Sequence, residues 1–375
     1  HETFNYGIGA QYMINKGNYI TADCYADHFS SSYCFFKDNK TYNGKAGEEQ
    51  VRKRTRNHNL SIKGIFKLGN RHKLSVGTEY IVDVLKSQTD NIAKEDAYTL
   101  ALFAQDEIKL LRNLQALIGV RYIYHENFKN HATPNVALMY KPGKFNFRAS
   151  YAAGFRTPTL SELYATDIAK KNDRLTIGNL DLKPEKNNYF SLSAEYVHER
   201  FSVSVNAFYN NIRDMIDYNT IATGDKAMEQ YGHKEVRQRD NIAEAKVHGI
   251  NVSANAYLGA GFNLSGGYTH LNTQDVELEQ PIDKSIKNAY NINAQWAHSW
   301  KIYRLNINLN GRINSKRFSK SYGYAPEYQL WDLNTRHSFN LKSVIIEPGF
   351  GMENLFDYMD DRPYNSNYAT LTPGR

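Results

Sequence analysis

Apolar and polar residues alternate one by one over many short stretches of this chain. The clearest stretch runs from Tyr303 to Asn310, where Tyr, Leu, Ile and Leu are interleaved with one Arg and three Asn. Alternation with a period of two is typical of a β-strand with one apolar and one polar face. Because asparagine indicates contact with water, this stretch predicts a strand that lies between lipid and water.

The same alternation recurs throughout the chain. Further stretches that show it are 74–80, 145–151, 190–196, 201–209, 250–258, 262–268 and 290–296. No helical period of comparable length competes with these patterns. The sequence therefore predicts an all-β protein.

Short and long connections alternate between these predicted strands. The short ones, rich in the residues that tight turns require, are 15–18, 68–71, 111–113, 141–144, 198–200 and 259–261. The long ones are 30–57, 86–97, 126–132, 155–186, 216–246, 272–287, 314–328 and 356–375. Short periplasmic turns and long extracellular loops are typical of an up-and-down antiparallel transmembrane β-barrel. The count predicts about 16 strands and a single barrel domain over residues 1–375.

Apolar and polar residues also alternate in the strands of a soluble β-sandwich, but a sandwich accounts for fewer features of this chain. It needs no alternation of turn and loop lengths, and its outer faces carry more charge than the Phe, Tyr, Val and Leu faces of this chain. A membrane barrel must also be closed, because unpaired backbone groups in lipid cost several kcal/mol each. We therefore expect further strands from outside these 375 residues.

Composition agrees with a barrel and excludes spanning helices. The chain has 28 Tyr and 3 Trp, which suit the boundary between lipid and water. The mean hydropathy of −0.63 and the lack of any run of about 18 apolar residues exclude membrane helices. A barrel stays allowed because only alternate residues face lipid. The sequence begins at His1 without the features of a signal peptide, so we expect the export signal to lie outside it.

Charge and cysteines narrow the function classes. The net charge is +7, and the densest basic run, 52–56, is interpreted as a solvated loop, because no nucleic-acid-binding motif accompanies it. We therefore expect no nucleic-acid partner. Cys24 and Cys34 lack zinc-site spacing, so they are either a local disulfide or two unpaired thiols.

Five sequence motifs occur in order over residues 98–375. Residues 151–164 read YAAGFRTPTLSELY and residues 178–186 read GNLDLKPEK; they resemble the paired FRAP and NPNL boxes of TonB-dependent receptors. The segments KVHGI (246–250), ENLFD (353–357) and TPGR (372–375) are similar to further motifs of that family. The residues that match the paired boxes are Phe155, Arg156, Pro158, Asn179, Asp181, Leu182, Pro184 and Glu185.

The resemblance implies a transporter rather than an enzyme. It implies a barrel of 22 strands, of which this chain would supply strands six to twenty-one. A plug domain, the first strands and the last strand would lie outside the chain. The implied partners are TonB, through the absent N-terminal region, the lipid and lipopolysaccharide of the outer membrane, and a surface lipoprotein.

The paired boxes are interpreted as the base of the long loop 155–186. Gly154 and Pro158 would end one strand, and Pro184 would precede the next. We expect Arg156 to pair with Asp181 or Glu185 across this base. The alternative is that the boxes contact the ligand directly.

The resemblance is closest to receptors for haem and iron complexes. Such receptors often carry a histidine between the boxes, but here Tyr164 is the iron-compatible side chain, and Leu180 replaces a preferred proline. Tyrosinate and imidazole can both bind haem iron. The candidate ligands are Tyr164, His28, His125, His131 and His233, each with the alternative of being a solvated loop residue.

Three cations near Tyr164 would attract anions such as haem propionates, acidic siderophores or lipopolysaccharide. They are Lys170, Lys171 and Arg174. Haem is the favoured ligand, carried as cargo, with no permanently bound cofactor or metal. Cobalamin or a ferric siderophore is the alternative ligand, and a passive porin is the alternative class. No hydrolase constellation accompanies a motif, so we expect no catalytic residue.

Overall fold

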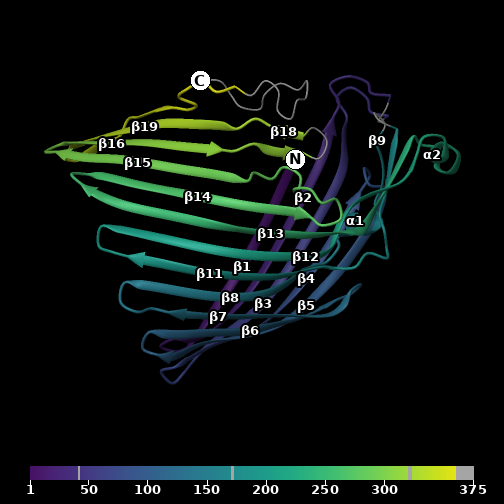
Figure 1. Cartoon of the computed structure of the whole chain (residues 1–375). Helices are drawn as coiled ribbons and strands as arrows, with labels where there is room; N and C mark the ends of the chain where they lie inside the picture. Colours follow the sequence, from purple (N-terminus) through teal and green to yellow (C-terminus); the bar gives the residue numbers. More distant parts are fainter. Residues whose placement is uncertain (41–42, 170–172, 320–322, 360–375) are drawn as a thin grey trace. The chain divides into compact units, whose positions relative to one another are not determined.

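The computed structural model describes residues 1–40, 43–169, 173–319 and 323–359 of the chain. Strands dominate, and they pair in antiparallel order with their sequence neighbours (Figure 1). The predicted all-β, up-and-down antiparallel fold is confirmed. The chain divides into two compact units, and each is described by itself. No helix in the described residues is long and apolar enough to span a membrane.

Unit 1 comprises residues 1–137, 152–188 and 212–243. Its first six strands form a meander in which each strand pairs antiparallel with the next. They are β1 (Glu2–Asn15), β2 (Asn18–Cys34), β3 (Glu49–Leu68), β4 (His72–Ser87), β5 (Ile92–Leu111) and β6 (Leu114–His125). Gly17 enables the tight turn after β1, since its φ of 100° is one that other residues rarely adopt.

Unit 2 comprises residues 138–151, 189–211 and 244–375. Its pairing is again antiparallel between neighbours. The strands are β13 (Glu235–Gly259), β14 (Phe262–Asp275), β15 (Asn288–Trp300), β16 (Tyr303–Asn314), β19 (Tyr328–Leu341), β20 (Val344–Ile346) and β21 (Gly349–Met352). A separate hairpin is formed by β17 (Arg317–Ser319) and β18 (Gly323–Ala325).

Five strands contribute residues to both units. They are β13 and the four strands β7 (Lys129–Tyr140), β8 (Phe145–Arg156), β11 (Glu185–Val197) and β12 (Phe201–Thr223). Fifteen described strands have twelve or more residues, and β20 and β21 together occupy one further place beside β19. The predicted number of about 16 strands is confirmed.

The one-by-one alternation of residues corresponds to the two faces of a strand, as predicted. Along β7, exposed and half-buried residues alternate without interruption from His131 onward. The exposed ones include Val136, Leu138 and Tyr140, at 43–46% exposure. A soluble sheet would bury such a row, so this face is the one expected to meet lipid.

Several strands are longer than the alternation predicted. The predicted loop 30–57 shrinks to 35–48, the loop 86–97 to 88–91, and the loop 126–132 to 126–128. The basic run 52–56, interpreted as a loop, lies inside β3. Beyond the lipid both faces of a strand can be polar, so the alternation stops while the hydrogen-bonded ladder continues. The predicted connection 356–375 lies outside the described residues from 360 onward.

The possibility of a local disulfide is wrong. Cys24 and Cys34 both lie on β2 and are free and exposed. Ten residues of strand separate them by roughly 33 Å. Disulfide formation needs Cα atoms within about 7 Å. The alternative of two unpaired thiols is the correct one.

Candidate functional site

The connection between β8 and β11 carries the paired boxes and folds into three small elements. They are α1 (Leu160–Tyr164), β9 (Thr166–Ala169) and β10 (Arg174–Ile177). Thr159 begins the helix: its hydroxyl accepts a hydrogen bond from the Glu162 N–H at 3.2 Å. The Glu162 carboxylate accepts one in return from the Thr159 N–H at 2.8 Å. This reciprocal capping box fixes where the helix starts.

Arg156 holds the base of this loop. Its guanidinium donates two hydrogen bonds to Glu185, at 2.6 and 2.8 Å, and two to Glu162, at 2.9 and 3.3 Å. Glu185 also accepts the Ile216 N–H at 2.8 Å, which ties β12 to the same point. Of the two partners expected for Arg156, Glu185 is the one that it contacts. A two-pronged guanidinium–carboxylate contact is strong and directional.

Both carboxylates at the loop base are largely buried, with side-chain exposures of 13% for Glu162 and 15% for Glu185. Burial alone would raise the pKa of Glu162. The hydrogen bonds from Arg156 and from the Thr159 backbone outweigh this effect and lower the pKa of Glu162 below its usual value. The carboxylate is therefore charged and fully engaged at neutral pH.

The second box packs against the backbone of α1. The Gly178 N–H donates to the Ala165 carbonyl at 2.7 Å, and the Asn179 N–H donates to the Glu162 carbonyl at 3.0 Å. A Cβ on Gly178 would lie 2.4 Å from the Leu163 carbonyl oxygen, so only glycine allows this approach. The two boxes therefore form one scaffold around α1.

Apolar side chains hold α1 on two sides. Leu160 packs with Leu85, Ile92 and Ala97. On the other side Leu163 packs with Leu182 and Ile216. The motif residues Pro158 and Pro184 are buried as well, and Phe155 stacks on the ring of His131 at 4.7 Å. These contacts are all internal, as a loop scaffold requires.

A cavity of about 460 Å³ lies beneath α1 in unit 1. This volume suits a small molecule. Its walls mix charges, hydroxyls and apolar groups. They include Asp27, Phe29, Lys53, Thr55, Asn57, Asp83 and His125 from the strands, with Thr157, Thr159 and Ser161 from the loop.

Tyr164 is poorly suited to bind iron in this arrangement. It is half-buried against both apolar clusters beside α1. Burial, followed by the negative charges of Glu95 and Glu126, raises the pKa of its phenol. Iron prefers the phenolate. The local environment therefore opposes the form that would bind.

His125 and His131 both have one ring nitrogen engaged. His125 is buried at the cavity wall, and its Nδ1 accepts the Asn127 N–H at 3.1 Å, which leaves the proton on Nε2. His131 donates from Nε2 to the Phe128 carbonyl at 3.0 Å, so its free nitrogen is Nδ1. Neither histidine presents Nε2 as an acceptor in this hydrogen-bonding state.

His28 was expected on a loop edge, and that placement is wrong. It lies within β2, opposite Arg56 on β3. Its ring contacts His58 edge-on at 5.4 Å. Side chains alternate across a strand, so His28 points to the face opposite that of its neighbour Asp27, which lines the cavity. The structure does not bring His28 together with the other candidates.

His233 lies where two loops meet. It follows α2 (Gly224–Tyr231), which ends at Gly232 with a φ of 71°. Its Nδ1 donates to the Asp173 carboxylate at 2.9 Å. The next backbone N–H, of Lys234, donates to the Asp173 carbonyl at 3.0 Å. The hydrogen bond from His233 lowers the pKa of Asp173, so this carboxyl is ionised at neutral pH.

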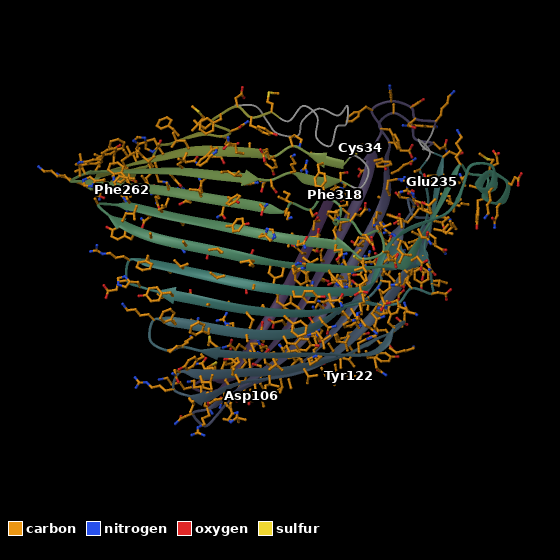
Figure 2. The ribbon with its side chains drawn as sticks, in the orientation of Figure 1. Cys34, Asp106, Tyr122, Glu235, Phe262 and Phe318 are labelled. Atoms are coloured by element: carbon orange, nitrogen blue, oxygen red, sulfur yellow. The ribbon has the colours of Figure 1, made fainter. Side chains whose placement is uncertain are left out.

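The parallel pairing of β10 with β13 brings the two loops together. Its register sets Arg174 opposite Glu235, which is two residues after His233 in the sequence. Figure 2 shows Glu235 close to α2. The predicted cations Lys170 and Lys171 lie outside the described residues. Arg174 is half-buried on β10, adjacent to Asp173.

Two residues of the site were absent from the sequence prediction. Glu162 could have been found, because Thr159 and Glu162 have the spacing of a capping box. Asp173 could not, because it lies sixty residues from His233 and no local pattern connects them.

Three comparisons relate this architecture to known proteins. A family model described as TonB dependent receptor-like, beta-barrel matches residues 2–355. A curated relative, the "Probable hemoglobin and hemoglobin-haptoglobin-binding protein 4" of Haemophilus influenzae, is 28% identical over 165 residues. That alignment covers 40% of this chain and 16% of the relative.

Solved structures with the same fold have low sequence identity. A mutant of the ferric enterobactin receptor PfeA from Pseudomonas aeruginosa superimposes with a TM-score of 0.78 at 17% identity, covering 95% of this chain and 56% of that one. The siderophore receptor PirA from Acinetobacter baumannii gives 0.75 at 16%, covering 99% and 61%. The FrpB iron transporter from Neisseria meningitidis gives 0.69 at 14%, covering 91% and 57%.

The antiparallel meander with exposed apolar rows defines a transmembrane β-barrel protein of the outer membrane. The chain belongs to the family of TonB-dependent receptor-like β-barrels. It spans a sixth of the curated relative and a little over half of these structures.

Proposed function

We propose that this chain is the barrel portion of a receptor that takes up an iron complex, with haem as the favoured ligand. Capture on the loops would be followed by rearrangement of a plug domain, driven by TonB. Neither a catalytic residue nor a resident cofactor is part of this proposal. The observation that carries the haem preference is the hydrogen bond between His233 and Asp173.

This pair has the arrangement of a metal-binding histidine. A ligating histidine commonly donates its second ring N–H to a carboxylate, which fixes the tautomer and raises the basicity of the free nitrogen. Asp173 accepts from Nδ1, so in the neutral imidazole Nε2 is the ring nitrogen that carries the lone pair. The His233 side chain is 19% exposed, which leaves it reachable from solvent. An imidazole of this kind can bind haem iron axially.

Two further features support haem. Arg174, adjacent to Asp173, offers positive charge to an anionic propionate. The Haemophilus influenzae relative is named for binding of hemoglobin and hemoglobin–haptoglobin. Tyr164, His125, His131 and His28 are weaker candidates, because within the described residues none of them donates a hydrogen bond to a carboxylate.

The second candidate ligand is a ferric siderophore, and the cavity beneath α1 favours it. Lys53 and several hydroxyl groups line this cavity, and they could bind an anionic oxygen-rich complex without supplying a ligand to iron. The PfeA structure is named as a ferric enterobactin receptor and the PirA structure as a siderophore receptor. Cobalamin has no separate observation in its favour.

Haemin titration of the full-length receptor in detergent tests the proposal. We expect a stoichiometric shift of the Soret band in the wild type and its loss or displacement in His233→Ala. His198→Ala is the matched control, because His198 lies in the turn between β11 and β12. Unchanged haemin binding by His233→Ala would overturn the assignment of the ligand. No Soret shift, together with tight binding of ferric enterobactin, would replace haem by a siderophore.

Uptake assays distinguish the receptor from a passive porin. Transport by the receptor should stop in cells that lack TonB, because the plug then stays in place. A porin would continue to admit small solutes in those cells. Continued uptake without TonB would therefore contradict active transport.

A further inference from the structure

The two faces of β14 and β15 can be assigned from the strand register. Phe262, Leu264 and Ile292 lie on one face and are 50%, 44% and 37% exposed. Figure 2 shows Phe262 at the turn end of β14. Side chains alternate across a strand, so Ser265 and its cross-strand partner Asn293 lie on the opposite face. The apolar face is the one expected to meet lipid, and the opposite face is therefore the inner one.

The inner face of β12 to β16 in unit 2 has no charged residue over most of its length. Asp, Glu, Lys and Arg are absent from five stretches, which are 201–211 of β12, 249–259 of β13, 262–271 of β14, 288–300 of β15 and 305–311 of β16. The inner side chains of these stretches are mostly Ser, Thr, Asn and Gln. We call the inner face of the five stretches the neutral wall.

Several side chains of the neutral wall form hydrogen bonds with one another. The hydroxyls of Ser204 and Ser253 are 2.7 Å apart. Nδ2 of Asn293 donates to Oδ1 of Asn308 at 2.7 Å and to Oδ1 of Asn310 at 2.6 Å. Amides and hydroxyls both donate and accept, so each can exchange a neighbour for a passing molecule. A neutral hydrogen bond is also weaker than one to a charged group, so the wall offers many weak contacts.

The inner face of β2 to β6 in unit 1 carries charged side chains instead. Glu79 of β4 forms an ion pair with Arg121 of β6. Lys73 of β4 forms another with Glu107 of β5, at 3.0 Å. Charge-assisted hydrogen bonds are roughly twice as strong as neutral ones. A complex that carries carboxylates would therefore be held longer on such a face than on the neutral wall.

A cavity of about 490 Å³ opens near the loop end of the neutral wall. Asn291 and Arg312 line it, together with the acids Asp332 and Glu353. Arg312 forms no ion pair within the described residues, and a guanidinium can bind a carboxylate through two parallel hydrogen bonds. Asp332 already accepts the Asn354 N–H at 2.9 Å. The negative charge of the two acids weakens the hold on an anion, which suits a transient stop.

Passage across a membrane needs contacts that a molecule can both form and leave, so many weak contacts serve it better than a few strong ones. We propose that the transported complex crosses the membrane along the neutral wall, with the cavity at Arg312 as a transient stop. The inference rests on the proposed function and adds to it the strands that the complex follows. The charged inner face of β2 to β6 is not part of this route.

The test adds one positive charge to the neutral wall of the full-length receptor. Ser265→Lys and Asn308→Lys each place an ammonium group where the wall has no charge. The initial rate of haemin uptake per receptor, in cells at saturating haemin, should fall at least roughly tenfold in both variants, because a charged donor holds a propionate longer than a neutral one. The haemin affinity of the purified receptor, from the Soret band, should not change, since the proposed capture site at His233 is unaltered.

Ser61→Lys is the matched control. Ser61 is a half-buried serine on the inner face of β3, as Ser265 is on that of β14. Its cross-strand partner is Glu79, which would pair with the new lysine. This variant adds the same charge to the receptor and should take up haemin at the rate of the wild type.

Three outcomes would overturn the route. They are wild-type uptake rates in both wall variants, an equal fall in Ser61→Lys, which would show that any added inner charge slows transport, and a loss of haemin affinity in the wall variants. If the wild type takes up ferric enterobactin and not haemin, the rates are compared for that anionic complex, with the same expected results. Uptake of neither complex by the wild type would contradict the proposed function, which distinguishes that failure from a failure of the route.

Discussion

Two clusters of charged side chains in unit 1, the loop base around Arg156 and the His233–Asp173 pair, differ in how many of their polar atoms have a hydrogen-bond partner. At the loop base, Arg156 contacts both Glu185 and Glu162, and each carboxylate also accepts a backbone N–H. At the meeting point of the two loops, His233 has only its Nδ1 bonded within the described residues. The first group has its bonding capacity committed to the fold, whereas the second retains an acceptor for another molecule.

Burial explains why the two groups differ. The Glu162 and Glu185 side chains are 13% and 15% exposed, whereas Asp173 is 38% exposed. An unpaired charge costs far more in a buried position than in contact with water. The loop base therefore tolerates no unsatisfied group, and the His233–Asp173 pair can keep one. This difference in burial distinguishes the loop base from the proposed binding site more clearly than the sequence motifs do.

Removal of the arginine should have the largest effect. Arg156→Ala leaves two carboxylates facing one another with no cation, and it should destabilise the loop base by about 2–3 kcal/mol, less than for a wholly buried pair because Arg156 is 43% exposed. Hydrogen exchange of residues 160–164 should accelerate accordingly. Arg148→Ala on the same strand is the control. Unchanged protection of α1 would mean that the apolar contacts alone hold the helix.

A substitution at Gly178, in the second box, should loosen the contact between that box and α1. In Gly178→Ala the new Cβ meets the Leu163 carbonyl, a backbone atom that cannot turn aside. Overpacking of this kind costs about 1–3 kcal/mol. Proteolysis within 157–184 should become faster than in the wild type. A variant as resistant as the wild type would show that α1 shifts freely, contrary to a rigid loop base.

Removing the negative charge of Asp173 should weaken haemin binding and leave the loop base unchanged. Asp173→Asn keeps an acceptor but removes its charge, so haemin affinity should fall by about tenfold, as for other second partners of metal-binding histidines. Exchange protection of α1 should not change. Asp225→Asn, in the first turn of α2, is the control and should bind haemin normally. A loss of α1 protection in Asp173→Asn would show that the two groups are not separate.

Acidification should destabilise the loop base over a defined pH range, and we expect this effect to be the smallest of the four. The folded-state pKa of Glu162 lies below its usual value of 4.5. A depressed carboxyl pKa contributes stability that is present above the unfolded pKa and is lost as pH falls through the folded pKa. Protection of α1, corrected for intrinsic exchange, should stay constant from pH 7 to about pH 5 and fall below about pH 4.5. A loss already near pH 6 would point to a histidine instead.

Much of the fold could be predicted because its physical signals are local. The alternation at 303–310 and the turn glycine at Gly17 each depend on a few neighbouring residues, and both predictions are confirmed. The ends of strands were predicted less well. In 52–56 the residues on both faces are polar, so the alternation is lost although β3 continues.

The candidate site was less predictable because its contacts are long-range. Arg156 and Glu185 were found through motifs that flank one loop. The partner of His233 depends on the parallel pairing of β10 with β13, whose register no local pattern encodes. The raised pKa of the Tyr164 phenol likewise depends on burial and on Glu95 and Glu126, which approach only in the folded chain.

The parallel pairing of β10 with the first residues of β13 has a mechanical consequence. Four residues of one loop are joined by a backbone ladder to four residues of another, from Arg174 opposite Glu235 to Ile177 opposite Gln238. Two loops joined in this way form a single flap and cannot fluctuate independently. Any opening of this flap would therefore move both loops together, as a collective motion of the kind that takes microseconds to milliseconds. The lifetime of a captured ligand would then be set by one opening event.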